Sequence, residues 1–543
     1  MKRLQIHHSI YVLLTAALCV AMPLSNYMMS MMLIFLMANW LIEWDFKAKW
    51  KRLKENRSAL LALLFMMVFC LGFVRADDFA VALDYWVTKL PLFMAPVMVA
   101  SSQRLNHKEL NFILFCYVLS VLFATVYSTV YYVNHEVQDI REISVFISHI
   151  RFSLCIDVAI VLLVYFAFKE KHWSNPALGK FSAVVLSVLM FVPIWFKDKN
   201  WPVFGKILAS MTCVWLIIYL FIAQTLTGIV LLLLVAVAYL LYVLFCHWKE
   251  KTYRWAAVGL FYLLAVFMVF VGSMTWRYFH VDKSRYLTID TVTVNGNPYE
   301  NNMNSMVENG SPIGMYVCEE EMERAWASRS DKDLSNAVDK ATLMRYLNSC
   351  HLRKDSAGVM ALSDGDVHNI ERGIANVDYT SAFGIKRALY PIFFSMELYR
   401  CTGDVQNSTL LQRAEYMRAA WHLIQRNWGL GVGLGNHKTA VSEQLKQEGS
   451  CMCWKERIGC HNQWLTFWLM GGVAVPLTFL VLLIYPFIEQ KKKITFVYVA
   501  FFIILVGSMF TEDTLETQAG LTLFAIMNSI LLYGFNLNHY ENS

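Results

Sequence analysis

Long apolar segments alternate with short polar segments along most of this 543-residue chain. About 20 apolar residues in an α-helix cross the hydrocarbon core of a bilayer, and most of these segments approach that length. They lie near residues 9–24, 27–44, 58–74, 86–101, 109–133, 151–168, 180–196, 206–223, 226–246, 255–273, 462–487, 494–510 and 517–535. The pattern predicts an all-α membrane protein that crosses the bilayer many times.

The composition favours the same class. Hydrophobic residues make up 57% of the chain and charged residues only 16%, with a mean hydropathy of +0.43. A soluble globular chain carries about 25% charged residues. The net charge of +6 comes largely from Lys and Arg in the short loops, so it gives no reason to expect nucleic acid as a partner.

The charges in the loops predict an orientation. Short cytoplasmic loops are enriched in Lys and Arg, which assigns the basic loops 47–57, 103–108, 169–172, 249–254 and 491–493 to the cytoplasm. The mixed or acidic loops 75–78, 134–143 and 511–518 then lie outside it. Three apolar runs lie between residues 169 and 249, where an even number is required, so one of them, or a merged pair, does not span fully. We expect about 12 spans with both termini in the cytoplasm.

One large polar segment interrupts the apolar pattern. The predicted domains are an N-terminal membrane bundle (1–274), an external loop domain (275–460) and C-terminal membrane helices (461–543). Stretches such as "DLSNAVDKATLMRYLNSC" have helical patterning, so we expect a folded, mainly helical loop domain. The segment "GIKRALYPIFFSMELY" (384–399) is too short and too charged to span, and we expect it to lie along the membrane surface or over a cavity.

Half of the 12 cysteines fall in this external loop: Cys318, Cys350, Cys401, Cys451, Cys453 and Cys460. An even number of cysteines outside the cytoplasm favours disulfides, with 15 possible pairings. Free thiols are the alternative. A zinc site is a third possibility, because "CMCWKERIGCH" holds three Cys and one His, but it lacks the usual C-x₂₋₄-C pairs.

Two stretches near the C-terminus carry the candidate chemistry: "NWGLGVGLGNHK" (427–438) and "CHNQWLTFWLMGG" (460–472). The first contains alternating glycines but neither the third glycine of a dinucleotide fingerprint nor the Gly-Lys-Ser/Thr of a phosphate-binding loop. Nucleotide binding is therefore excluded. Alternating glycines instead allow the backbone to approach other groups closely. The second stretch places His461 at the start of an apolar helix, where an interfacial polar residue is the simplest interpretation.

Together, an arginine-bearing helix, a Gly-x-Gly turn, an external loop and His-Asn at the head of a span resemble the O-antigen ligase and O-antigen polymerase superfamily. The hydropathy layout resembles that family over the whole chain, although the motifs cover only about sixty residues. The stretch "RYLNSCHLRKDSAGVMALSDGDVHNIERGIAN" (345–376) is similar to a segment of Bacteroidetes-type members. Members of the superfamily are GT-C-like membrane glycosyltransferases of the bacterial inner membrane. They transfer a glycan from a polyprenyl diphosphate carrier to an acceptor on the periplasmic side.

The resemblance implies roles for seven residues. His461 matches the catalytic base, and Arg413 matches the arginine that precedes the Gly-x-Gly turn. Arg151 is similar to a basic residue that lines the site. The family's Ser-Arg-Gly unit has no arginine counterpart here, since "TLTG" (225–228) is the nearest match, so Arg151 or Arg277 could supply the second diphosphate contact. The remaining substrate-binding residues are those of the turn: Gly431, Gly433 and Gly435.

This assignment is chemically coherent. Arginine binds phosphate oxygens in pairs, and a neutral histidine can accept a proton from an acceptor hydroxyl. We therefore expect an inverting, single-displacement transfer without metal or cofactor, onto a glycolipid, glycan or protein acceptor. Acidic residues on external loops leave a metal-dependent transfer open: Asp77, Asp78, Glu136 and Asp139. A repeat-unit polymerase, a lipid-linked glycan transporter and a receptor-like membrane protein are the other functional alternatives.

Overall fold

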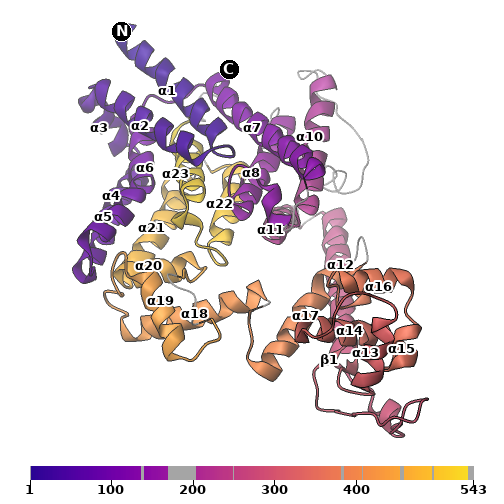
Figure 1. The fold of residues 1–543 in the computed structure, drawn as a ribbon. Helices are drawn as coiled ribbons and strands as arrows, with labels where there is room; N and C mark the ends of the chain where they lie inside the picture. The colour runs from indigo at the N-terminus through magenta and orange to yellow at the C-terminus, as the bar shows by residue number, and fades with distance from the viewer. Residues whose placement is uncertain are drawn as a thin grey trace. The chain divides into compact units, whose positions relative to one another are not determined.

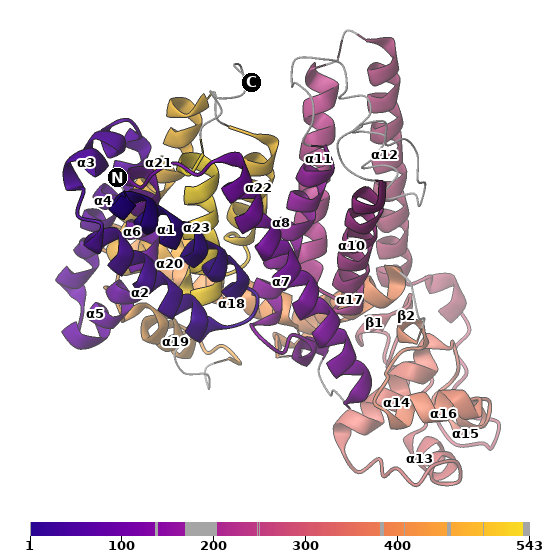
Figure 2. The same cartoon turned by 90° about the horizontal axis from the view of Figure 1, so that it is seen from above.

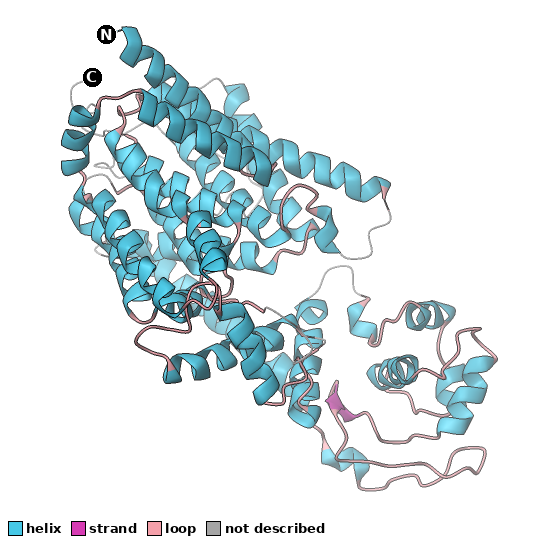
Figure 3. Ribbon diagram, turned by 60° about the vertical axis from the view of Figure 1, so that its left-hand side comes forward, coloured by secondary structure: helices cyan, strands magenta, loops and turns pink. Residues whose placement is uncertain are grey.

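A computed structural model describes residues 2–135, 140–168, 203–246, 248, 250–380, 385–406, 408–452, 458–491 and 494–535. Helices make up most of these residues (Figure 3). Within the described ranges the only paired strands are the two-residue β1 (Val307–Glu308) and β2 (Ser311–Pro312). The structure therefore confirms the all-α class predicted from the hydrophobic pattern.

Several of the helices are long and apolar enough to cross a membrane. Five meet both conditions: α1 (Lys2–Ala21), α4 (Arg57–Phe69) with the 3₁₀ turn η1 (Cys70–Arg75), α7 (His107–Asn134), α8 (His149–Phe168) and α11 (Leu226–Cys246). A sixth is possible if α2 (Asn26–Ile42) and α3 (Phe46–Lys54), bent by 109°, form one span. Shorter apolar helices include α10 (Val203–Ile222), α21 (Ala474–Glu489), α22 (Phe496–Ser508) and α23 (Gln518–Tyr533). The predicted run 180–196 and loop 169–172 lie outside the described residues.

Two predicted spans are broken helices. The run 86–101 forms α5 (Phe79–Thr88) and α6 (Leu90–Ser101), which meet at Lys89. The run 462–487 forms α20 (Gln463–Gly471) and α21, separated at Gly472, whose φ is +75°. Hydropathy averages over such breaks, so the sequence did not reveal them.

The chain divides into two compact units. Unit 1 contains residues 1–249, 416–448 and 455–543, whereas unit 2 contains 250–415 and 449–454. This grouping differs from the predicted domain boundaries at two places. The long helix α12 (Lys251–Phe279) belongs to unit 2, and the glycine-rich stretch belongs to unit 1 together with most of α18 (Thr409–Arg426) and all of α19 (His437–Gln447).

Helix α23 lies in the core of unit 1, packed against α6, α22 and α2 (Figure 1). Helix α8 packs against α7, α10 and α11 (Figure 2). An aromatic cluster joins α4, α6, α20 and α21, with ring centroids 5.0–5.9 Å apart: Phe65, Phe69, Phe93, Phe467 and Phe479. These contacts fix the two broken helices, α5–α6 and α20–α21, within the bundle.

At one end of this bundle, contacts join loops predicted to be cytoplasmic. The Glu489 carboxylate accepts hydrogen bonds from the backbone N–H groups of Arg57 and Ser58, both at 2.7 Å. Arg52 Nε donates to Ser101 O at 2.6 Å. These contacts cap α4 with the end of α21 and join the end of α6 to α3.

At the other end, contacts join loops predicted to be external. Arg75 Nη1 donates to Gly431 O at 2.8 Å, and Gln463 N donates to Met509 O at 2.9 Å. Helices α4, α6, α21 and α23 run from the first group of loops to the second. The loops predicted to be cytoplasmic therefore lie at one end of these helices, and the loops predicted to be external lie at the other end.

In unit 2, a buried ion pair connects the β1–β2 hairpin to α14 (Ala337–Ser349). Arg345 donates to both Glu308 carboxylate oxygens, at 2.8 and 3.0 Å, and Asn376 Nδ2 donates to one of them at 2.7 Å. Asn348 and Lys354 hold the same hairpin and the loop after it through backbone carbonyls. Polar residues of the 345–376 stretch therefore hold the hairpin in place, whereas the core of unit 2 is an apolar cluster that includes Trp326, Leu343 and Leu347.

Unit 2 also contains four smaller helices and two 3₁₀ turns: η3 (Lys283–Tyr286), α13 (Glu319–Ala327), α15 (Ser356–Met360), α16 (Asp364–Glu371), η4 (Val377–Tyr379) and α17 (Ile385–Thr402). Helix α17 contains most of the segment predicted to lie on the membrane surface. It packs Tyr390 and Phe393 against Met274 and Tyr278 of α12. Its apolar face is thus partly used within unit 2.

The cysteines of the predicted external region correct an expectation. Cys318, Cys350, Cys401, Cys451 and Cys460 are free thiols, so no disulfide forms among these five described residues. Cys460 Sγ instead contacts Thr466 Oγ1 at 2.9 Å, and Cys451 Sγ donates to Gly403 O at 3.9 Å. Cys453 lies outside the described residues.

The stability of unit 2 is expected to fall in acid because of Glu321. Burial would raise the pKa of this carboxyl, but hydrogen bonds from Thr293, Asn297, Ser356 and Asn295 outweigh burial and lower its pKa from 4.5 to about 2. Because its pKa is lowered, the ionised Glu321 carboxylate stabilises folded unit 2. This contribution is complete above about pH 4.5 and is lost as the pH falls toward 2. Amide hydrogen exchange in the full chain should show residues 293–297 losing protection across that range.

A Glu321→Ala variant provides the control. Its 293–297 segment should exchange rapidly at every pH and lose the acid transition. An unchanged transition in this variant would show that another group controls the docking of the segment.

Candidate active site

His461 lies in the turn that leads into α20. Its φ is +53°, a left-handed conformation that is uncommon for residues other than glycine and costs about 1–3 kcal/mol. Two neighbouring contacts hold it there. The His461 N–H donates to Asp513 Oδ2 at 3.0 Å, and Asn462 caps α20 by accepting from Trp464 N and Leu465 N. Strain of this kind is concentrated at functional sites.

The imidazole of His461 lies between an aromatic ring and a carboxylate. The Tyr416 ring stacks on it with centroids 5.7 Å apart, and Glu512 Oε2 lies 3.7 Å from Nδ1. The His461 side chain is 37% exposed, whereas that of Glu512 is 3% exposed. The ring therefore has a buried anion beside one nitrogen and accessible surface for a substrate. The separation is longer than a hydrogen bond, so the carboxylate acts on the ring through its charge.

Arg151 binds the same loop that carries Glu512. Its Nη1 donates to Glu512 Oε2 at 3.0 Å, Nη2 to Asp513 O at 2.9 Å, and Nε to Thr517 Oγ1 at 3.2 Å. The residue is 8% exposed. All three guanidinium nitrogens thus bind protein, which makes Arg151 a clamp on residues 512–517.

Asp513 links this loop to the backbone of His461. Its other carboxylate oxygen accepts from Thr466 Oγ1 at 2.6 Å. Burial raises the pKa of Asp513, although the bond from Thr466 opposes the shift. Because Asp513 is held by both α20 and the turn before it, the position of His461 depends on this loop.

A second buried cation holds the far end of the loop. Lys89, at the junction of α5 and α6, donates to Glu516 Oε1 at 2.8 Å and to Leu515 O at 2.6 Å. Gln463 bridges the same two residues, donating to Glu516 at 3.1 Å and accepting from Leu515 N at 2.8 Å. Burial would raise the pKa of Glu516, but the charges of Lys89 and His437 and the hydrogen bonds from Lys89 and Gln463 together outweigh burial and lower this pKa. The segment 512–517 is therefore fixed by Arg151 and by Lys89.

The glycine-rich stretch packs backbone against backbone. Gly431 and Gly433 have φ values of +70° and +103°, and a Cβ at either would collide with Leu469 O or Arg75 O. Val432 N donates to Leu469 O at 2.7 Å, and Leu434 N donates to Gly72 O at 2.8 Å. Close approach is the property predicted for these glycines, and their partners are the ends of α20 and η1.

A Gly433→Ala substitution is expected to destabilise unit 1 by about 1–3 kcal/mol, because the new Cβ would overlap a backbone carbonyl at a left-handed residue. Gly429→Ala is the matched control, since a Cβ there meets nothing within 4 Å. Thermal unfolding of both variants in detergent measures the difference. Equal stability would contradict the packing role of Gly433.

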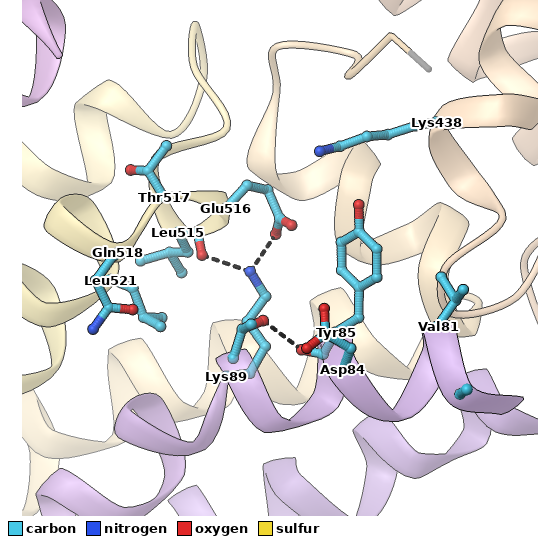
Figure 4. Close-up of a pocket in the computed structure, with 12 residues that line it drawn as sticks. Val81, Asp84, Tyr85, Lys89, Lys438, Leu515, Glu516, Thr517, Gln518 and Leu521 are labelled. Carbon is cyan, nitrogen blue, oxygen red and sulfur yellow. Dashed lines mark hydrogen bonds and ion pairs between the residues drawn. The ribbon is translucent and has the colours of Figure 1, made fainter. Parts of the chain in front are cut away.

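Beside the 512–517 loop lies an open cleft of about 700 Å³. Figure 4 shows Tyr85 and Lys438 on one side, Thr517 and Gln518 on the other, and the Lys89–Glu516 pair between them. All of these residues belong to unit 1. The cleft and His461 therefore share one supporting loop.

The structure brings some of the predicted site residues together. His461, Arg151 and the three glycines lie in unit 1, and Glu512 connects His461 with Arg151. Arg413 and Arg277 belong to unit 2, so they are not part of the geometry described for unit 1.

The predicted acidic residues fall outside this site or outside the described chain. Asp78 caps α5 by accepting from Ala80 N and Val81 N. Glu136 and Asp139 lie outside the described residues.

Sequence reasoning missed three participants: Lys89, Glu512 and Glu516. A lysine within the apolar run 86–101 was a usable signal, because charged residues inside membrane segments are costly and often functional. The acidic loop "TEDTLETQ" was used only to predict orientation. Nothing local in the sequence indicates that Glu512 faces a histidine 51 residues earlier.

Neither a comparison with protein-family models nor a search of curated protein sequences finds a match for this chain.

Proposed function

We propose that the protein is a membrane glycosyltransferase of the O-antigen ligase type. It would move a glycan from a polyprenyl diphosphate carrier onto a hydroxyl of a glycolipid, glycan or protein acceptor. The observation that carries this proposal is the His461 ring, held in a strained turn with Glu512 3.7 Å behind its Nδ1. A partly exposed histidine backed by a buried carboxylate is suited to remove a proton from a hydroxyl.

The proposed reaction is a single displacement. His461 Nε2 takes the proton from the acceptor hydroxyl as its oxygen bonds to the anomeric carbon of the donor. The bond from that carbon to the diphosphate oxygen breaks, and the polyprenyl diphosphate leaves with the electron pair. Attack from the face opposite the leaving group inverts the anomeric configuration. Glu512 stabilises the imidazolium formed at His461.

The arginines divide into two roles in this proposal. Arg151, whose guanidinium binds Glu512, Asp513 and Thr517, positions the catalytic loop. We propose Arg413 as the diphosphate-binding residue, with Arg277 as a second contact, because the family resemblance assigns these roles to them. Guanidinium groups suit this task because they pair with phosphate oxygens in a planar fork.

We further propose about 12 membrane spans and an active site that faces the periplasm. The separation of the basic and acidic loops to opposite ends of α4, α6, α21 and α23 supports this orientation, as does the position of His461 among the acidic loops. The donor and the acceptor lipid would reach the site from the outer leaflet of the cytoplasmic membrane.

Loss of the protein from its host cell tests this function. A ligase predicts that lipid-linked glycan accumulates at the periplasmic surface, where added glycosidase can reach it, while the acceptor carries no glycan. Expression of Arg413→Ala should fail to restore transfer. A polymerase predicts acceptors that carry one repeat unit, and a transporter predicts glycan that glycosidase cannot reach. Either of those results would contradict the ligase proposal.

A further inference from the structure

The cleft beside the catalytic loop has a mixed lining of hydrogen-bonding groups. Asp84, Tyr85 and Thr88 come from α5, Lys438 from α19, and Gln518 from α23. These side chains offer amine, amide and hydroxyl donors together with carboxylate, amide and hydroxyl acceptors. Its volume of about 700 Å³ falls within the range of small-molecule sites, about 300–1,000 Å³.

The charges of the cleft balance. Two cations, Lys89 and Lys438, face two carboxylates, Asp84 and Glu516. Lys89 and Glu516 already neutralise each other in a buried pair at 2.8 Å. A site for diphosphate would present an excess of positive charge, so this lining fits an uncharged ligand.

Tyr85 gives the cleft a fixed aromatic face. Its ring meets the buried His437 edge-on, with centroids 5.2 Å apart, and the Lys438 ammonium lies 5.7 Å from its centroid (Figure 4). Each sugar ring has hydroxyl groups that both donate and accept hydrogen bonds, and C–H faces that pack on aromatic rings. The combination of Tyr85 with amide, hydroxyl and balanced charged groups matches that chemistry.

We infer that this cleft binds uncharged sugar units of the glycan substrate. The inference rests on the proposed function, since that function supplies the glycan. Residues 512–518 join the two sites, because Glu512 faces His461 whereas Glu516 and Gln518 line the cleft. Sugar held in the cleft would be held beside the loop that positions the base. The donor glycan and an acceptor glycan share this chemistry, and the kinetic test below separates them.

Purified full-length protein in detergent allows the test. Tyr85→Ala is expected to raise the KM of one of the two substrates about tenfold with a smaller change in kcat, since a tyrosine at the centre of a contact contributes on this scale. A raised donor KM assigns the cleft to the donor glycan, and a raised acceptor KM assigns it to the acceptor glycan. Tyr27→Ala, which removes a tyrosine 71% exposed on α2, is the control and should leave both KM values unchanged.

Asp84→Ala serves as a second variant, because Asp84 is exposed and its loss does not unpack His437. It is expected to raise the same KM as Tyr85→Ala. Unchanged KM values for both substrates in both variants would overturn the sugar assignment and leave the proposed function intact.

A direct binding experiment tests the sugar-binding cleft independently of glycan transfer. Saturation-transfer NMR with a neutral disaccharide, N,N′-diacetylchitobiose, should show contact with the wild type and a loss of signal in Tyr85→Ala. Inorganic diphosphate should not compete, and competition would contradict the uncharged-ligand assignment. Disaccharide binding through Tyr85 by a wild type that transfers no glycan would overturn the proposed function and support the cleft.

Discussion

Replacing His461 with alanine is expected to lower the rate of glycan transfer by about 10²- to 10⁴-fold, the usual contribution of a general base. Without the imidazole, the acceptor hydroxyl would lose the group that we propose takes its proton. Initial rates from equal amounts of folded protein in membranes measure the effect. The KM of the donor should change much less than kcat, because His461 acts on the acceptor oxygen.

His422→Ala is the matched control for this experiment. His422 lies in the same unit, its side chain is 41% exposed, and it also pairs with a glutamate, Glu448, at 2.7 Å. Loss of a partly exposed pair of this kind costs on the order of 1 kcal/mol, so transfer should remain near the wild-type rate. Comparable rates in the two variants would remove His461 from the mechanism.

Replacing Arg151 with methionine is expected to destabilise unit 1 by about 3–5 kcal/mol, because it breaks the buried ion pair between Arg151 and Glu512. The loop 512–517 would lose three hydrogen bonds together with this charge. Unfolding in denaturant, followed in detergent, measures the loss. Transfer by the protein that remains folded should also fall, since Asp513 and Glu512 position His461.

The double variant Arg151→Met/Glu512→Gln separates charge from packing. Removing the negative charge of Glu512 should recover part of the stability while transfer stays low. Arg324→Ala, which breaks an exposed pair with Glu320, is the control and should cost less than about 1 kcal/mol. A stable, active Arg151→Met protein would show that the loop is held by other contacts.

Much of the architecture could be predicted from local patterns. Apolar runs predicted the helices, because an apolar segment buried in lipid or in a bundle has to satisfy its backbone hydrogen bonds internally, as a helix does. His461 and the glycine stretch could be singled out because each belongs to a short local motif. The close backbone approach at Gly431 and Gly433 also followed from residue type, since only glycine permits it there.

The remaining features depend on contacts between distant segments. Glu512 meets Arg151 across 361 residues, and Lys89 meets Glu516 across 427. A single sequence contains no signal for such pairs. Arg151 was therefore predicted to contact substrate, whereas its guanidinium binds residues 512–517. The helix breaks at Lys89 and Gly472 could not be predicted either, because each is stabilised by a segment remote in sequence.

Glycan transfer by the purified wild-type protein in proteoliposomes is the most direct measurement. The donor is a labelled glycan on undecaprenyl diphosphate, the preparation is treated with chelator, and the His461→Ala protein is measured beside it. We predict that the wild type forms glycosylated acceptor and free undecaprenyl diphosphate in equal amounts, with inverted anomeric configuration, and that His461→Ala forms neither at a comparable rate. Equal transfer by the two proteins, or no transfer by folded wild type, would contradict a glycosyltransferase built around His461.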